Sequence, residues 1–154
     1  MKKTTIFTSL LMACIIFLSS CFLDPEETTS GSSRKKAIEL TVNQWASGNI
    51  VDENSGGTGE QWFKFVATAE TQRVYVKFST MTRMKVTIYD INYNSIGTSS
   101  SFRGDSGTSD YVEKSLNSGS TYYIKVEDSP GYYGYSGTGQ YWIGFSASNS
   151  GPSK

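Results

Sequence analysis

Apolar and polar side chains alternate along most of the chain between residues 37 and 147. Val74, Val76 and Phe78 share one face of such a segment, while Tyr75 and Lys77 lie between them. A period of two is typical of antiparallel strands with one buried and one solvated face. The pattern therefore predicts strands at residues 37–42, 61–67, 73–79, 84–91, 95–98, 111–116, 121–127 and 140–147, with a shorter one at 45–50.

Short strands separated by regular turns, with no helical stripe between them, are typical of an all-β sandwich. The 154 residues fit one domain. The 15 Gly and 10 Tyr, with few Leu, also favour strands and turns over helices. We expect a single antiparallel β-sandwich of about eight or nine strands at residues 37–148, followed by a disordered tail at 149–154.

The first 20 residues have the organisation of an export signal. Lys2 and Lys3 form a basic start, and residues 6–18 are mostly apolar. That apolar run is shorter than the roughly 20 residues that a bilayer-spanning helix needs. Small residues, Ser19 and Ser20, follow it, as cleavage of a signal peptide requires. Residues 1–20 are therefore interpreted as a signal peptide.

Cys21 completes the motif Leu18-Ser19-Ser20-Cys21, which resembles the lipobox of bacterial lipoproteins. The resemblance implies cleavage before Cys21, acyl chains on this residue and stable anchoring in a lipid bilayer, since two or more chains hold a protein firmly. An ordinary secretory signal followed by a chance cysteine is the alternative. Cys14 leaves with the signal, so lipidation also explains why the exported chain keeps one thiol.

Residues 24–36 show no apolar period and are rich in Ser, Thr and charged side chains. Such a segment buries too little apolar surface to offset the entropy of ordering. We therefore expect residues 21–36 to form the lipidated cysteine and a flexible tether, which anchor an exported protein to the bacterial cell membrane or to the outer membrane.

The charge balance argues against nucleic acid as a partner, since the 14 basic and 14 acidic side chains give no long-range attraction to phosphates. The chain has no His, which excludes Ser–His–Asp and Cys–His catalysis. Paired carboxylates hydrolyse glycosidic bonds without His, so a carboxylate-dependent glycan hydrolase remains the least favoured alternative. We expect the protein not to be an enzyme.

Two segments of the sequence echo each other. GTGEQWFKF at 57–65 and GTGQYWIGF at 137–145 share five of nine positions. Independent use of a Gly-rich turn before a strand is the favoured interpretation. The alternative places the two strands side by side with Trp62 and Trp142 on one face, which would suit a structural subunit that docks on another envelope protein.

Four segments together resemble the bacterial pre-peptidase C-terminal domain over roughly residues 37–147. They are QWFKF at 61–65, MKVTIYD at 84–90, LNSGSTYYIKV at 116–126 and GQYWIGF at 139–145. The resemblance implies a jelly-roll β-sandwich without catalytic activity, of a kind usually appended to secreted enzymes. Here the segment follows the lipobox with no protease domain between them, which puts that helper role in doubt.

Some members of this family bind extracellular polymers and calcium. Calcium takes six to eight oxygen ligands. The residues with oxygens in the corresponding region are Asp52, Glu53, Asn54 and Glu60. A solvated acidic loop is the favoured interpretation, and the sequence predicts no bound cofactor.

Residues 129–137 join the last two strong strands and carry three tyrosines among Gly, Ser and Pro. Loops hold binding residues more often than strands do, and a tyrosine presents a flat apolar ring with a polar tip. We expect Tyr132, Tyr133 and Tyr135, with Trp142, to bind an extracellular polysaccharide or protein, unless the tyrosines fold back over the sandwich. A second loop at 99–105 exposes Phe102 and shares the patch if both loops lie at one end.

Overall fold

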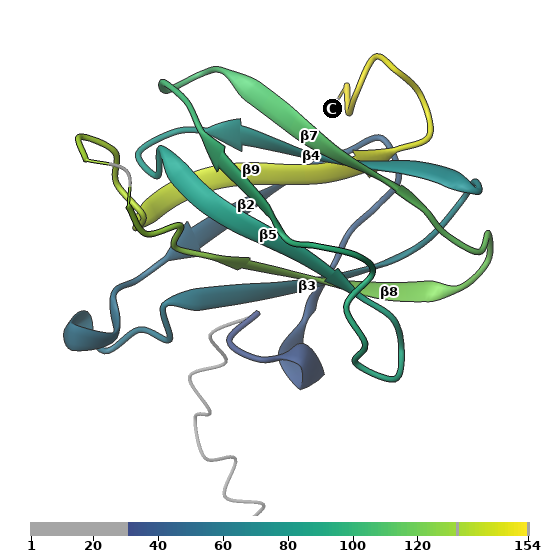
Figure 1. Cartoon of the computed structure of the whole chain (residues 1–154), viewed down its shortest axis with the longest axis horizontal. Coiled ribbons are helices and arrows are strands. Elements are labelled where there is room, and N and C mark those ends of the chain that lie inside the picture. Colours follow the sequence, from purple (N-terminus) through teal and green to yellow (C-terminus); the bar gives the residue numbers. More distant parts are fainter. Residues whose placement is uncertain (1–30, 132, 154) are drawn as a thin grey trace, which may run out of the picture.

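The computed structural model describes residues 31–131 and 133–153. This part of the chain forms nine strands and two short 3-10 helices, with the two sheets packed face to face (Figure 1). The elements are η1 (Arg34–Lys36), β1 (Ile38–Glu39), β2 (Trp45–Ile50), η2 (Glu53–Ser55), β3 (Glu60–Val66), β4 (Thr71–Phe78), β5 (Arg83–Tyr89), β6 (Ser100–Arg103), β7 (Ser109–Ser115), β8 (Thr121–Glu127) and β9 (Gly139–Ser146).

The strand order is that of a jelly roll. One sheet runs β1-β3-β8-β5-β6 and the other runs β2-β9-β4-β7. All neighbours are antiparallel except β1, which pairs with β3 in parallel at the edge. Strands β2 to β9 thus form the two four-stranded sheets of a double Greek key, and the predicted β-sandwich of jelly-roll type is confirmed.

Alternate side chains from both sheets fill the core. Phe63 and Phe65 of β3 point inward, as do Tyr141 and Phe145 of β9, and all four are buried. The Phe65 and Phe145 ring centroids lie 4.7 Å apart, and those of Phe63 and Tyr141 lie 6.3 Å apart. The two echoing segments therefore face each other across the core.

This arrangement excludes the alternative in which Trp62 and Trp142 meet on one face, and agrees with the favoured interpretation of two independent strands. Their strands belong to different sheets, and each tryptophan lies on the outer side of its own sheet because its neighbours point inward. Trp62 is only 2% exposed, whereas Trp142 is 43% exposed. A docking face that contains both side chains is therefore excluded.

The strand predicted at 95–98 is also wrong. Ser95 makes one isolated bridge to Tyr89, and the strand beside β5 is instead β6. In this register Phe102 lies opposite Met84 and enters the core, so it is not the exposed loop aromatic that the sequence suggested. The strand predicted at 37–42 shortens to the two residues of β1.

Both ends of the domain extend beyond the predicted limits. Gly31 is buried and its backbone N–H donates to the Lys36 carbonyl oxygen at 2.7 Å, so the folded part starts before residue 37. The tail was expected to be disordered, but its residues 149–153 pack against the domain. Pro152 is buried, and the Ser153 N–H donates to the Asn43 carbonyl at 3.1 Å.

The predicted signal peptide and Cys21 lie outside the described residues. Within the part of the chain that the structure describes, no helix has the length and apolar character to cross a membrane.

Candidate functional site

A cleft of about 480 Å³ lies at the edge of the sandwich, where β2 and β9 approach the other sheet. None of the described residues that line it is charged. They are Ile38, Ser47, Gly48, Asn49, Gln61, Gln140, Tyr141 and Trp142.

The pairing of β2 with β9 builds the open side of the cleft. Ser47 lies opposite Trp142, and Asn49 lies opposite Gln140. Residues that are directly opposite, or two apart on one strand, share a face of the sheet. An exposed indole is therefore flanked by one hydroxyl and two amide groups.

Tyr141 forms the floor of the cleft. Its hydroxyl donates to Gln61 Oε1 at 2.9 Å, and the Asn49 backbone N–H donates to the same oxygen at 2.8 Å. Burial raises the pKa of the Tyr141 hydroxyl well above its ordinary value of 10.0, so the group stays a neutral donor. Gly48 leaves room for the ring, since a Cβ there would lie 2.2 Å from Tyr141 Cζ.

A smaller hollow of about 220 Å³ adjoins this cleft and shares Asn49 and Gln61 with it. We call these two adjoining hollows together the edge groove; their lining extends from Trp142 to Gly57. Glu60 brings a carboxylate to the far end, but one of its oxygens accepts a hydrogen bond from Trp62 Nε1 at 2.7 Å. Among the described residues, no protein group hydrogen-bonds the exposed side-chain amides of Asn49 or Gln140, so both are available to a ligand.

The predicted tyrosine loop lies elsewhere. Tyr133 is 99% exposed and Tyr135 is half-buried, and neither lines the edge groove. Tyr132 falls outside the described residues. Of the four predicted binding residues, the groove therefore contains Trp142.

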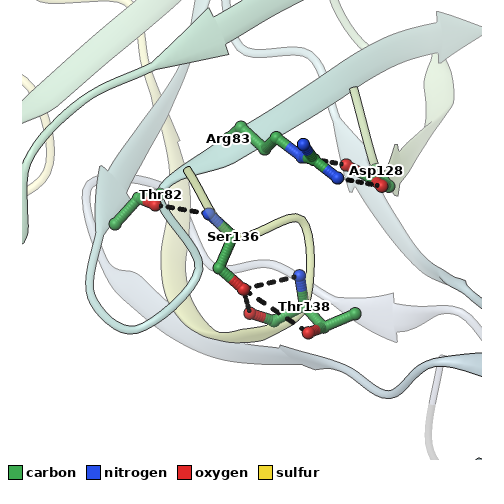
Figure 2. A network of polar contacts seen from close by, with 5 residues as sticks. All are labelled: Thr82, Arg83, Asp128, Ser136 and Thr138. Atoms are coloured by element: carbon green, nitrogen blue, oxygen red, sulfur yellow. Dashed lines mark hydrogen bonds and ion pairs between the residues drawn. The ribbon is translucent and has the colours of Figure 1, made fainter. Parts of the chain in front are cut away.

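Hydrogen bonds hold the base of the loop that carries Tyr133. The backbone N–H groups of Thr82 and Arg83 donate to the Ser136 carbonyl at 2.8 and 2.9 Å. The Ser136 N–H donates back to Thr82 Oγ1 at 2.9 Å (Figure 2). The Ser136 hydroxyl donates to the Thr138 carbonyl, while Arg83 binds Asp128 through two hydrogen bonds of 2.7 and 2.9 Å (Figure 2). Tyr133 thus projects from a loop whose base is fixed.

The tyrosine loop and the loop at 99–105, whose placement at one end was left open by the sequence, do approach the same end of the sandwich. The Gly104 N–H donates to the Thr82 carbonyl at 3.0 Å, next to the Thr82–Ser136 contacts. Phe102 contributes nothing to that surface because it is buried in the core.

The acidic loop shows no converging set of calcium ligands. Asp52 caps η2 by accepting the Asn54 N–H at 2.7 Å, and Glu60 bonds Trp62. In the described ranges, no three His, Cys, Asp or Glu side chains are grouped so as to hold a metal ion.

Comparisons with known proteins give similarity of fold. No family model and no curated protein matches the chain. Among solved structures, the pre-peptidase C-terminal domain of collagenase from Bacillus anthracis is 16% identical with a TM-score of 0.47, covering 71% of this chain and 93% of that domain. It belongs to the family that the sequence motifs resemble.

The enzymatically active domain of tailspike protein 4 from bacteriophage CBA120 is 12% identical with a TM-score of 0.35. The match covers 71% of this chain and 18% of the tailspike chain. At these levels of similarity neither structure supports a functional argument.

Charged side chains form a ladder on the outer face of the first sheet. Lys85 contacts Glu127, and Lys125 Nζ lies 2.5 Å from Glu127 Oε2 and 3.7 Å from Glu60 Oε2. Burial raises the pKa of the Glu127 carboxyl, but hydrogen bonds from Lys125 and Lys85 outweigh it, so the pKa lies below its ordinary value of 4.5. Glu127 therefore remains ionised at neutral pH.

Replacing Glu127 with glutamine is expected to lower the free energy of unfolding at pH 7 by about 1 kcal/mol, because it leaves two lysines without their shared carboxylate. Since the folded pKa lies below the unfolded value, this stabilisation is present above about pH 4.5 and is lost as the pH falls through the folded pKa. Urea unfolding at pH 7 and pH 3 measures the difference. A gap between wild type and variant that is as large at pH 3 contradicts the explanation.

The matched control is Glu39→Gln. Glu39 pairs with Lys64 at 3.3 Å, but its side chain is 72% exposed. An exposed ion pair of this kind contributes only a few tenths of a kcal/mol, so the control is expected to unfold almost as the wild type does at both pH values.

Proposed function

We propose that this chain is an exported, non-catalytic binding protein, held to a bacterial membrane by acyl chains on Cys21, whose sandwich recognises an extracellular polysaccharide through the edge groove. The lipobox motif supports the anchor, and the side chains around Trp142 support the ligand class.

The exposed indole of Trp142, with polar groups on both sides, is the observation that carries the polysaccharide proposal. A sugar ring presents C–H groups on its faces and hydroxyls around its rim. A flat aromatic ring packs against such a face, and amide side chains both donate to and accept from hydroxyls. Because the cleft beside Trp142 is lined by neutral groups, it suits a neutral sugar chain.

The carboxylates support a role without catalysis. A glycoside hydrolase places two carboxyl groups on either side of the bond and raises the pKa of one of them. Among the residues that the structure describes, the edge groove is lined by one carboxylate, Glu60, which is bonded to Trp62. Nearby, Glu127 has a lowered pKa and Asp128 pairs with Arg83.

The experiment that tests the proposal compares Trp142→Ala with the wild type. Binding is first found on an array of neutral polysaccharides, and the dissociation constant is then measured by calorimetry. Losing a central aromatic contact is expected to weaken binding about 30-fold, with little change in melting temperature because Trp142 is partly exposed. Equal affinities for variant and wild type contradict the groove as the binding site.

Tyr111→Ala provides the matched control. Tyr111 has the same 43% exposure and lies on β7, at the opposite edge of the sheet from β2. Its removal is expected to leave the affinity unchanged. A Tyr133→Ala variant completes the set, and a loss of affinity in this variant alone would move the binding site to the tyrosine loop.

An extracellular protein is the second candidate ligand. The side chain of Tyr133, 99% exposed on a loop with a fixed base, favours it, since rigid exposed tyrosines are common anchors in protein recognition. A blank polysaccharide array, followed by capture of a protein that requires Tyr133, would favour this candidate over the first.

A further inference from the structure

Basic and apolar side chains meet on the surface where the chain enters the fold. Arg34 Nη1 of η1 donates to the Ile91 carbonyl at 3.3 Å, which joins η1 to the turn that follows β5. Figure 1 shows η1 and the β5–β6 connection on the same side of the molecule. Lys35 and Lys36 are exposed there, and Ile91 and Tyr93 are 60% and 49% exposed. These four side chains are called the entry surface.

The turn that presents Ile91 and Tyr93 is rigid. Asp90 accepts two hydrogen bonds from Asn94, from the backbone N–H at 2.8 Å and from the side-chain amide at 3.0 Å. Tyr93 has a φ of +72°, a left-handed conformation that is unfavourable for a side chain of this size. The surroundings must therefore stabilise this conformation.

Ring stacking provides that stabilisation. The Tyr93 ring lies 4.9 Å from Tyr89 at an interplanar angle of 13° and 5.6 Å from Trp62 at 28°. The Arg34 guanidinium lies 4.8 Å from the Tyr93 ring centroid and 5.2 Å from that of Tyr123. Aromatic and cation–π contacts of this kind hold both the turn and η1 in place, so the entry surface needs no partner to form.

The length of the preceding segment indicates what lies against this surface. About ten residues separate Cys21 from Gly31, the first described residue. A chain of that length reaches at most about 35 Å when fully extended. If acyl chains hold Cys21 in a bilayer, Gly31 stays within about 35 Å of the lipid headgroups.

The chemistry of the entry surface fits a bilayer. Tyrosine is enriched at membrane interfaces, and basic side chains are attracted to anionic headgroups. We infer that Lys35, Lys36, Ile91 and Tyr93 rest on the headgroups of the bilayer that holds the anchor, so that the sandwich has a defined orientation on the membrane. This inference rests on the lipid anchoring proposed above.

The test uses the mature chain with Cys21→Ser, which carries no acyl chain, so binding reports the entry surface alone. Co-sedimentation is measured with neutral phosphatidylcholine vesicles and with vesicles that also contain an anionic phospholipid. The protein is expected to bind the anionic vesicles more tightly. Lys35→Glu, which reverses one charge, is expected to weaken this binding about tenfold. Ile91→Asp should weaken this binding several-fold, whereas Ile91→Leu, which keeps an apolar side chain, should bind as the unsubstituted protein does.

Lys77→Glu is the control, because Lys77 is an exposed lysine on β4 of the other sheet. It is expected to bind as the unsubstituted protein does. Equal effects of Lys35→Glu and Lys77→Glu, or no preference for anionic vesicles, would overturn the inference. Cell fractionation of the wild type against Cys21→Ser tests the acyl anchor separately, so failure of the anchor and failure of the entry surface give different results.

Discussion

Replacing Phe65 with alanine is expected to lower the free energy of unfolding by about 4 kcal/mol. The side chain is 1% exposed, and its ring centroid lies 4.7 Å from that of Phe145 and 5.9 Å from that of Tyr122. The substitution removes the contact between the two sheets at this point and leaves a cavity that rigid strands cannot close. Because domains are stable by only about 5–15 kcal/mol, the variant should lose a large share of its stability.

Urea denaturation monitored by tryptophan fluorescence measures this loss. Tyr133→Ala is the control, since its fully exposed ring should contribute less than about 0.5 kcal/mol. A loss below about 1 kcal/mol for Phe65→Ala would mean that the two sheets are not joined by this contact.

Replacing Gly48 with alanine is expected to lower the stability by about 2–3 kcal/mol and to abolish ligand binding in the edge groove. The new Cβ would lie 2.2 Å from Tyr141 Cζ and 2.6 Å from both neighbouring ring carbons. The ring cannot simply move aside, because its hydroxyl is bonded to Gln61 and its edge packs on Phe63. Displacing Tyr141 also breaks the hydrogen bond from its hydroxyl to Gln61 Oε1, the oxygen that accepts from the Asn49 N–H.

A double-mutant cycle separates this clash from a general loss of structure. In a Tyr141→Leu background the smaller side chain makes room, so Gly48→Ala should be much less destabilising than in the wild type. Additive effects of the two substitutions would contradict the proposed steric cause. Ser47→Ala, at the neighbouring exposed position, is expected to leave the stability within about 0.5 kcal/mol of the wild type.

The inward side of most strands could be predicted because alternation is a local property. Phe63 and Phe65 of β3, and Phe145 of β9, point into the core as their spacing predicts. The strand at β6 could not be predicted in this way. Its sequence is mostly polar, and what makes it a strand is its pairing with β5, which brings Phe102 opposite Met84.

The candidate site shows the same limit. Trp62 and Trp142 occupy equivalent places in two similar motifs, yet Trp62 is buried and Trp142 is exposed. The rings of Tyr93 and Tyr89 pack against Trp62 and cover it. Trp142 was predicted as a binding residue and lines the edge groove, whereas Asn49 and Gln140, which line it as well, were not predicted. Predicting them requires the register of β2 against β9, which places Asn49 opposite Gln140. The local sequence pattern does not specify this register.

The pairing of β2 with β9 also links the site to the folding of the chain. These are the first and last strands of the jelly roll, so Asn49 and Gln140 come together only after nearly the whole domain has been made. Contacts between such distant residues form slowly, because closing a long loop has a high entropic cost. A chain that has not yet acquired β9 has no groove, so a ligand of the proposed kind would bind finished molecules and not incomplete ones. Such binding would stabilise the native state, and the sandwich would be harder to unfold wherever that ligand is abundant.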